Sequence, residues 1–223
     1  MNLLFRIKNL CIDFIFPKSL KVLKLEAFSP GALLGTLPPA TQPEDKDTIA
    51  IFDYKHPTTK EIVWELKYNG NTSIANKLGD ILHDAVHTEL SDLALFEPGG
   101  WRKNKLLLIP IPISNKRRFE KGWNQTELLC KRIMALDHTK IFEYIPGQLT
   151  KARHTESQVK TVSKNARREN LMNSMKVLEP EKISGRFVVL IDDVVTTGAT
   201  FREARRALRE AGAKKILCVA IAH

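Results

Sequence analysis

The segment from residue 187 to residue 222 constrains the fold of this chain more than any other part of the sequence. It contains two continuous apolar runs, FVVLI and ILCVAIA, on either side of a helical pattern at residues 199–211. Continuous rather than alternating apolar residues are typical of strands that are buried on both faces. Gly212 follows the helical pattern at the position where glycine commonly ends a helix. The segment therefore predicts a strand, a helix and a parallel strand within an α/β sheet.

The preceding part of the chain continues this alternation of strands and helices. The predicted elements are strands at 48–55, 106–109 and 142–146 and helices at 58–69, 72–90 and 123–136. Thr58 or Thr59 is expected to cap the first of these helices. We therefore expect one main α/β domain over residues 48–223, which is long enough to bury a sizeable core.

Residues 1–47 differ from the rest in their pattern. Apolar residues recur at helical spacing in the first part, at Leu3, Ile7, Leu10 and Phe14. They predict an amphipathic helix over residues 2–15 that packs on the main domain or, alternatively, lies on a membrane surface. Prolines and glycines interrupt residues 17–45, so we expect irregular structure there, with one short helix near residues 19–27. Residues 38–47 are interpreted as a linker, and residues 1–47 together as a helical cap and linker.

The cysteines and the apolar runs exclude several classes of protein. Cys11, Cys130 and Cys218 lie too far apart for a metal knuckle or a CxxC redox pair, so we expect neither zinc nor a disulfide framework. Cys130 and Cys218 lie in apolar runs and are expected to be buried. No apolar stretch approaches the ~18 residues of a membrane span, and the interrupted N-terminus is not typical of a signal peptide. These features favour a cytoplasmic protein.

The charge of the chain indicates anionic partners. Lys and Arg number 35 and Asp and Glu 25, which gives a formal net charge of +10. Nucleic acid, phosphorylated metabolites and an acidic membrane surface all fit that excess. Aromatic residues make up only 7%, and no basic stripe is interleaved with them in the sequence, so a dedicated platform for single-stranded nucleic acid has little support.

Polar residues gather where the apolar strand at 187–191 ends. Asp192 and Asp193 follow this strand directly, and TTGAT (196–200) leads into the next helix. In open α/β sheets, ligands bind at the carboxyl ends of the strands. Small residues, hydroxyl groups and a helix N-terminus suit a phosphate, whereas paired carboxylates suit sugar hydroxyls or a divalent cation. A ribose 5-phosphate is the simplest ligand with both features.

Two basic segments precede this site. Residues 109–125, IPIPISNKRRFEKGWNQ, follow the short apolar strand at 106–109, which favours an anion site over an ordinary solvated surface. Residues 151–170 are polar and basic and have no apolar stripe. Long polar segments in compact domains are often lids, and a plain pair of surface helices is the alternative.

The segment VVLIDDVVTTGAT (188–200) resembles the motif with which type I phosphoribosyltransferases bind phosphoribosyl pyrophosphate (PRPP). The resemblance implies that Asp192 and Asp193 bind the ribose 2- and 3-hydroxyls. It also implies that they hold Mg²⁺, directly or through water, as a cofactor that bridges ribose and pyrophosphate oxygens. The residues implied for the 5-phosphate are Thr196, Thr197, Gly198, Ala199 and Thr200.

The two basic segments are similar to the ComF family of phosphoribosyltransferase-like proteins. That family carries a PIPLS-type turn and an RGFNQ-type signature, which here read PIPIS and KGWNQ, with Lys121 in place of Arg. A later family pattern is represented by Arg153, Thr155 or Glu156, Gln158, Arg167 or Arg168, and Asn170. The residues implied for pyrophosphate are Ile111, Pro112, Lys116, Arg117 and Lys121. The catalytic residues implied are Asp192, Asp193 and Arg153, the last on a loop that closes over the substrate and excludes water.

The resemblance covers residues 48–222 and departs at the N-terminus. Many ComF members have a cysteine zinc module after a Phe-Pro turn, but here Phe16 and Pro17 are followed by KSLKVLKLEAF, without cysteine. The implied fold is therefore a type I phosphoribosyltransferase-like parallel sheet flanked by helices. It would have a small N-terminal helical or irregular segment that lacks the zinc module.

Two functions remain open at this stage. The first is transfer of a phosphoribosyl group from PRPP to an unknown acceptor with release of pyrophosphate, although no segment of residues 48–100 resembles a site that reads a base. The second is a non-catalytic protein that binds PRPP or single-stranded DNA as a regulator or accessory factor. ComF relatives are associated with DNA uptake in natural transformation, so competence proteins are possible partners. Arg205 is expected on the outer face of the 199–211 helix, away from the site.

Overall fold

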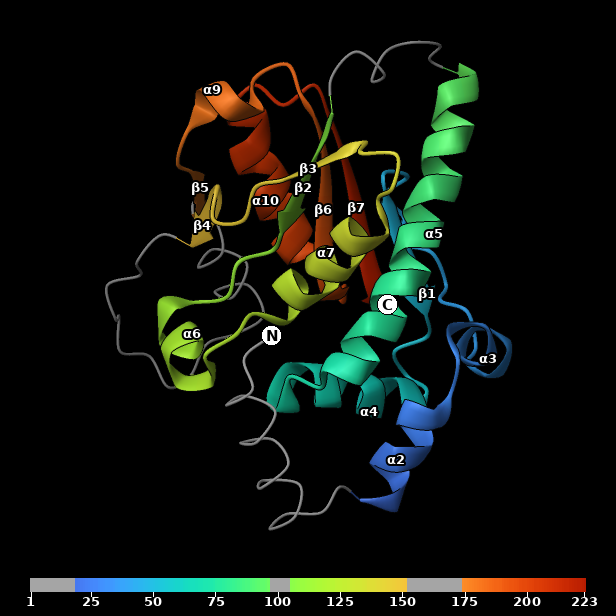
Figure 1. Ribbon diagram of the computed structural model, residues 1–223. Coiled ribbons are helices and arrows are strands. Elements are labelled where there is room, and N and C mark those ends of the chain that lie inside the picture. Colours follow the sequence, from blue (N-terminus) through green and yellow to red (C-terminus); the bar gives the residue numbers. More distant parts are fainter. Residues whose placement is uncertain (1–18, 97–104, 152–173) are drawn as a thin grey trace.

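A five-stranded parallel sheet forms the centre of the protein. The computed structural model describes residues 19–96, 105–151 and 174–223 (Figure 1). In their order across the sheet the strands are β1 (Thr48–Phe52), β7 (Lys215–Ala222), β6 (Phe187–Val194), β2 (Leu106–Pro110) and β3 (Phe142–Tyr144). β2 is buried along its whole length, and β6 and β7 nearly so. The prediction of an α/β sheet with centrally buried strands is confirmed.

Helices cover both faces of this sheet. α5 (Thr72–Phe96) and α7 (Gln125–Leu136) pack on one face, and α10 (Ala199–Glu210) packs on the other (Figure 1). Side chains alternate between the faces along β6. Val189 and Ile191 therefore enter the core beneath α5 and α7, while Val188 and Leu190 enter the core beneath α10. The cysteines follow the prediction, because Cys130 and Cys218 are both buried.

The predicted helix over residues 58–69 consists of two parts. α4 (Pro57–Trp64) continues directly into a π-helical turn, η1 (Glu65–Asn69), which ends at Gly70 with a φ of 57°. The predicted N-cap at Thr58 or Thr59 is wrong, because the N-cap is His56, two or three residues earlier. Pro57 then occupies the first helical position, where its fixed φ and missing N–H are tolerated.

The basic segment after β2 also contains a helix that the sequence did not predict. α6 (Asn115–Lys121) begins at Ser114, whose side chain caps the N–H of Arg117, and ends at Gly122 with a φ of 78°. None of its residues is buried, so it carries no apolar stripe by which it could be recognised. Its boundaries come from the cap residue and the glycine alone.

The described part of residues 1–47 is more ordered than expected. α2 (Leu20–Ala27) confirms the short helix near residues 19–27. A second helix, α3 (Pro30–Thr36), was not predicted, since Pro30 was interpreted as a breaker although it stands at the first turn, where proline is compatible with a helix. Leu25 and Leu33 belong to the core beneath α5, so both helices pack on the main sheet domain.

The predicted linker at residues 38–47 covers the open edge of β1. Ala40 donates its N–H to Ile51, and the Gln42 amide bonds both backbone groups of Ala50. Arg205 of α10 pairs with Asp45 and donates to the carbonyl of Asp47 and to Oγ1 of Thr48. Arg205 is only 4% exposed, so its predicted place on an outer helix face is wrong. Residues 38–47, to which Arg205 binds, cover the side of α10 that carries this arginine.

The remaining described elements are a small ribbon and a short helix. β4 (Leu149–Lys151) and β5 (Met175–Val177) pair antiparallel, and α9 (Pro180–Ile183) leads to β6. The predicted lid at residues 151–170 lies outside the described residues except for Lys151, and so does the predicted helix at residues 2–15. Within the described ranges, no helix has both the length and the apolar character that crossing a membrane requires.

Candidate functional site

The two adjacent carboxylates lie within β6 rather than after it. The strand extends to Val194, and Asp192 and Val194 pair with Ala220 and Ala222 at the end of β7. Because successive side chains point to opposite faces, Asp193 continues the row of Val189 and Ile191 and Asp192 the row of the α10 face. The sheet therefore presents one acid on each face at its carboxyl end.

Asp193 has strong protein partners. Nε2 of Gln125, in the first turn of α7, donates to Oδ2 at 2.9 Å, and Nζ of Lys67, in η1, lies 3.2 Å from Oδ1. The side chain of Asp193 is only 5% exposed. A buried carboxylate needs both charge and hydrogen bonds to offset its lost hydration, and Asp193 receives both.

Asp192 is held differently. Its Oδ1 accepts the backbone N–H of Asp193 at 2.8 Å. Burial raises the pKa of the Asp192 carboxyl well above its ordinary value, and the negative charge of Asp193 adds to that shift. Lys67 and Lys151, at the end of β4, oppose the shift through their positive charges. A cation or hydrogen-bond donor that arrived at Asp192 would favour its ionised form.

The loop after β6 forms an open helix start. Val195 is pinned by its N–H to the carbonyl of Ala222, whereas Thr196 and Thr197 are exposed. Gly198 is the N-cap of α10 with a φ of 66°, and having no side chain it leaves the first N–H groups of the helix without a side-chain cap. Arg202 donates to the carbonyl of Thr197 and thereby fixes the turn. Such a helix start suits an anion.

The turn after β2 is fixed to β6 and to α7. Ile111 donates its N–H to Ile191 at 2.9 Å, and its carbonyl accepts from Nδ2 of Asn124 and Oγ1 of Thr126. Both backbone polar groups of Ile111 are thus engaged within the protein, and Pro112 follows half-buried. Within the signature segment, Asn124 therefore binds the turn after β2, and Gln125 binds Asp193.

The basic residues predicted for pyrophosphate lie on α6. Lys116 and Arg117 are exposed on this helix. Lys121, at its end, donates to the carbonyl of Lys67 at 2.7 Å and stands 4.4 Å from the centre of the Tyr68 ring. Burial, followed by the charges of Arg117 and Lys67, lowers the pKa of Lys121. The structure thus links Lys121 to the acid pair through Lys67, while Lys116 stays at the surface.

Three neighbours of the acid pair were not assigned a role from the sequence: Lys67, Gln125 and Lys151. Gln125 belongs to the signature segment and Lys151 begins the predicted lid, so their positions could have been inferred. Lys67 gives no local signal, because a lysine near the end of a helix usually points into solvent. Arg153, predicted as catalytic, lies outside the described residues.

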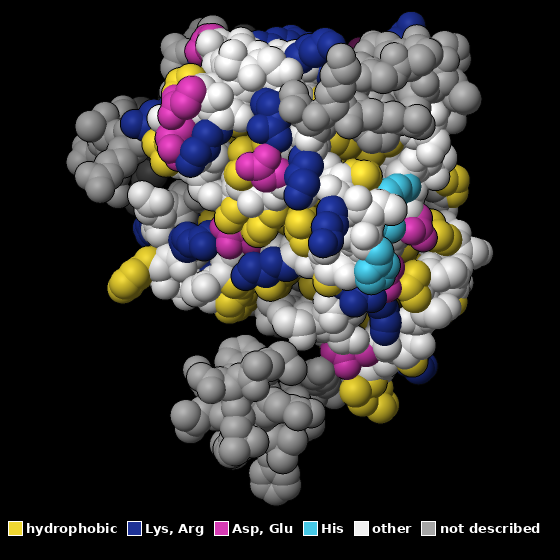
Figure 2. All heavy atoms as spheres, turned by 45° about the horizontal axis from the view of Figure 1, so that its top comes forward, with side chains coloured by type: hydrophobic (Ala, Val, Ile, Leu, Met, Phe, Trp, Pro, Cys, Tyr) yellow, Lys and Arg dark blue, Asp and Glu magenta, His cyan; other side chains and the backbone are white. Residues whose placement is uncertain are grey.

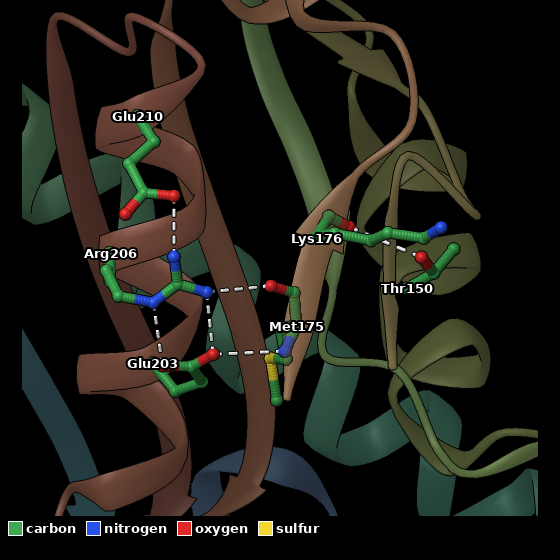
Figure 3. A network of polar contacts seen from close by, with 6 residues as sticks. All are labelled: Thr150, Met175, Lys176, Glu203, Arg206 and Glu210. Atoms are coloured by element: carbon green, nitrogen blue, oxygen red, sulfur yellow. Dashed lines mark hydrogen bonds and ion pairs between the residues drawn. The ribbon is translucent and has the colours of Figure 1, made fainter. Parts of the chain in front are cut away.

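Side chains of α10 fix the ribbon that carries Lys151 (Figure 3). Glu203 accepts the N–H of Met175 at 3.0 Å, and Arg206 donates to the carbonyl of Met175 at 2.8 Å and to Glu203. Met175 in turn pairs with Lys151 across the ribbon. The helix that begins after the loop of residues 196–198 therefore also positions Lys151.

The donor set at the acid pair fits Mg²⁺ better than a softer metal. Carboxylate oxygens are ligands that Mg²⁺ prefers, and it commonly takes one or two of them together with substrate oxygens and water. Among the described residues, no cluster of three or more His, Cys, Asp or Glu side chains could hold a metal ion. Mg²⁺ at Asp192 and Asp193 would therefore depend on a bound substrate for its remaining ligands.

Comparison with known proteins agrees with this geometry. Residues 140–223 match the family model described as phosphoribosyl transferase domain. The DNA utilization protein YhgH of Escherichia coli O157:H7 is 29% identical over 168 residues, 75% of this chain and 68% of that protein. Competence protein F of Haemophilus influenzae is 32% identical over 49% of this chain and 46% of its own length. Competence protein ComFC of Bacillus subtilis is 26% identical over 69% of this chain and 54% of its own.

The matched domain includes β6, the acid pair and the loop of residues 196–200, and the parallel sheet flanked by helices agrees with a type I phosphoribosyltransferase-like fold. The named relatives extend the similarity toward the N-terminal side of that domain, since they align with more of the chain than the family model does. The phosphoribosyl transferase domain and the similarity to YhgH, Competence protein F and ComFC together support a ComF-family phosphoribosyltransferase-like protein.

Proposed function

We propose that the protein binds Mg²⁺–PRPP at the carboxyl end of β6 and transfers the phosphoribosyl group to an acceptor, releasing pyrophosphate. The observation that carries this proposal is the juxtaposition of two buried carboxylates with an uncapped helix start in one continuous segment, β6 to α10. A sugar phosphate needs both carboxylates for its hydroxyls and an anion-binding helix start for its phosphate, next to each other. Few other small ligands do.

Each part of PRPP has a counterpart among the described residues. The 5-phosphate fits the loop of residues 196–200, where Thr196 and Thr197 are exposed and the start of α10 has no side-chain cap. The two acids lie on opposite faces of β6, so a single ligand could reach both only from beyond the carboxyl end of the strand. In that position the ribose hydroxyls would donate to Asp192 and Asp193. The pyrophosphate would lie toward α6, near Arg117 and Lys121. Bound Mg²⁺ would supply positive charge that offsets the negative charge of the diphosphate.

The protein's contribution to transfer is electrostatic. The bond between the anomeric carbon and the diphosphate oxygen breaks, and its electron pair leaves with pyrophosphate. An acceptor lone pair forms the new bond, and an acceptor proton passes to solvent. Arg117 and Lys121 would stabilise the charge on the leaving group, while Asp192 and Asp193 would stabilise the positive ribosyl group. A segment that excludes water would prevent hydrolysis at this stage, which is the role proposed for residues 151–170 and Arg153.

Isothermal titration calorimetry and a pyrophosphate assay test this function. We expect wild-type protein to bind Mg²⁺–PRPP and to release pyrophosphate with at least one member of a panel of nitrogen-containing acceptors. Binding without turnover across the panel would favour a PRPP sensor. If PRPP is not bound with or without Mg²⁺, the proposed function is wrong.

A second candidate is binding of single-stranded DNA in DNA uptake, as the competence names of two relatives suggest. The specific observation in its favour is that α4, η1 and α6 each carry an exposed aromatic ring and at least one basic residue. Trp64, Tyr68 and Phe119 are 52%, 55% and 92% exposed, and Lys121 stands over the Tyr68 ring. Base stacking on such rings tolerates any sequence.

The distribution of charge gives this candidate less support. On the face in Figure 2, Lys and Arg side chains are interspersed with acidic and apolar ones rather than gathered in one stripe. Binding of a fluorescent oligonucleotide that weakens steeply with salt would support DNA contact. Loss of that binding in Phe119→Ala and Tyr68→Ala would place it on these rings.

A further inference from the structure

Lys67 is a positively charged member of the proposed site to which neither the PRPP motif nor the ComF signature assigns a role. Its ammonium group lies 3.2 Å from Oδ1 of Asp193, and the Lys67 side chain is itself only 27% exposed. It comes from η1, far from the acid pair in the sequence. A lysine that is ordered in this way, at the place where a substrate would contact the acids, has a candidate role in binding that substrate.

The turn that carries Lys67 packs on the signature segment, residues 121–125. Lys121 donates to the carbonyl of Lys67 at 2.7 Å. Gly70 ends the turn in the left-handed region, and a Cβ there would lie 2.7 Å from the Trp123 ring. π-helical turns are rare and occur frequently at functional sites. The position of Lys67 therefore follows from contacts that join η1 to residues 121–125.

Positive charge accumulates at this junction. Lys67 approaches from η1, and Lys121 and Arg117 approach from α6. After burial, the charges of Arg117 and Lys67 lower the pKa of Lys121, while Asp193 and Glu120 act in the opposite direction. Lys121 is thus within electrostatic range of both Arg117 and Lys67, and a ligand that carries several negative charges would stabilise these cations.

The location of the cations distinguishes between the 5-phosphate and the 1-diphosphate of PRPP. The loop of residues 196–200 and the start of α10 suit the 5-phosphate. Lys67 instead lies with Asp193 and Gln125, beside α7 and α6. We propose that Lys67 binds the 1-diphosphate of PRPP, and that its ion pair with Asp193 is the resting arrangement that the ligand replaces. This inference rests on the proposed function, because it concerns the same site.

Calorimetry with three ligands tests the proposal: Mg²⁺–PRPP, Mg²⁺–pyrophosphate and ribose 5-phosphate. Lys67→Met should weaken binding of both diphosphate ligands by at least about tenfold, the effect of losing one charged hydrogen bond. It should change binding of ribose 5-phosphate by less than about twofold. Lys67→Arg keeps the charge and should retain most of the affinity. Lys60→Met, at an exposed position of α4, is the matched control and should bind all three ligands like wild type.

Three results would overturn the inference. Unchanged diphosphate binding in Lys67→Met would show that Lys67 does not contact this group, and tighter binding would show that it competes with the ligand. An equal loss for ribose 5-phosphate would show that Lys67 acts only by ordering the acid pair. If wild-type protein binds none of the ligands, the proposed function fails as well, and that result is distinguishable from the other three.

A measurement on wild-type protein tests the proposal even if Lys67→Met does not fold. Lysine acetylation by an excess of reagent, followed by mass spectrometry, reports the accessibility of Lys67. We expect Mg²⁺–pyrophosphate to slow modification of Lys67 and ribose 5-phosphate to leave it unchanged, with Lys60 as the internal reference. Equal modification of Lys67 with and without pyrophosphate would contradict the proposal.

Discussion

Asp192 and Asp193 are neighbours with the same chemistry, yet the two faces of β6 treat them differently. On the α7 face, Asp193 receives a hydrogen bond from Gln125 and an ion pair from Lys67. On the α10 face, Asp192 accepts a backbone N–H, and burial raises its carboxyl pKa. One acid is thus stabilised by the protein, whereas the other is buried at a cost that a ligand could offset. Unfavourable burial of this kind is typical of binding sites, where function outweighs stability.

Replacing both acids should have the largest effect on ligand binding. The double variant Asp192→Asn, Asp193→Asn keeps the shapes of both side chains but removes the charges that would hold Mg²⁺ and the ribose hydroxyls. We expect its affinity for Mg²⁺–PRPP to fall at least about hundredfold, roughly 2.7 kcal/mol. Calorimetry measures the affinity, and circular dichroism checks that the fold is intact. An unchanged affinity would mean that PRPP does not bind at this site.

The packing of η1 on Trp123, which positions Lys67 beside Asp193, can be disrupted at Gly70. Gly70→Ala places a methyl group 2.7 Å from the Trp123 ring, at a φ of 57°. The left-handed backbone costs about 1–2 kcal/mol and the overpacking adds a similar amount, so the free energy of unfolding should fall by about 2–4 kcal/mol.

Gly147→Ala is the matched control for that variant. Its φ is 84°, but nothing lies within 4 Å of the added Cβ. It should therefore cost only about 1–2 kcal/mol, the backbone component. Urea unfolding compares the two variants, and equal losses would show that the contact with Trp123 contributes nothing to stability.

The single variants of the acid pair should change stability in opposite directions. Asp193→Asn leaves the charge of Lys67 without its partner, so the free energy of unfolding should fall by about 1–2 kcal/mol at neutral pH. Asp192→Asn removes an acid whose raised pKa makes the charged form costly, so stability should rise by about 1 kcal/mol. Thermal unfolding of both variants decides this, and a change of the same sign in both would contradict the distinction between the two faces.

The α10 face can be tested without altering either acid. Arg206→Met removes the side chain that binds the Met175 carbonyl and so loosens the ribbon that positions Lys151. We expect the affinity for Mg²⁺–PRPP to fall about two- to fivefold, by less than about 1 kcal/mol, since the effect is indirect. Arg209→Met, at an exposed position of the same helix, should bind like wild type. Equal affinities in the two variants would show that the β4–β5 ribbon does not contribute to binding of Mg²⁺–PRPP.

Much of the fold follows from local sequence patterns. Continuous apolar runs identified β2, β6 and β7, and the pairing of two acids with TTGAT is the basis of the site that we propose at the end of β6. The placement of the acids on opposite faces also follows from the two-residue period of a strand. These features depend on residues that are close in the sequence.

The parts that were missed depend on contacts between distant segments. Lys67 reaches the site because Gly70 packs on Trp123, and no local pattern reports such a contact. Arg205 is buried because residues 38–47 cover the edge of β1 and bring Asp45 beside it. α6 has no buried face, so hydrophobic periodicity could not reveal it. Helical position alone cannot distinguish a solvated lysine or arginine from one with a distant partner.

A crystal structure of the protein soaked with Mg²⁺–PRPP tests the central claim most directly. We expect the 5-phosphate on the loop of residues 196–200 and the ribose hydroxyls within hydrogen-bond distance of Asp192 and Asp193. We also expect the diphosphate near Lys67 and Lys121. PRPP bound elsewhere, or an acid pair that keeps its present partners while the ligand occupies another part of the surface, would contradict this claim.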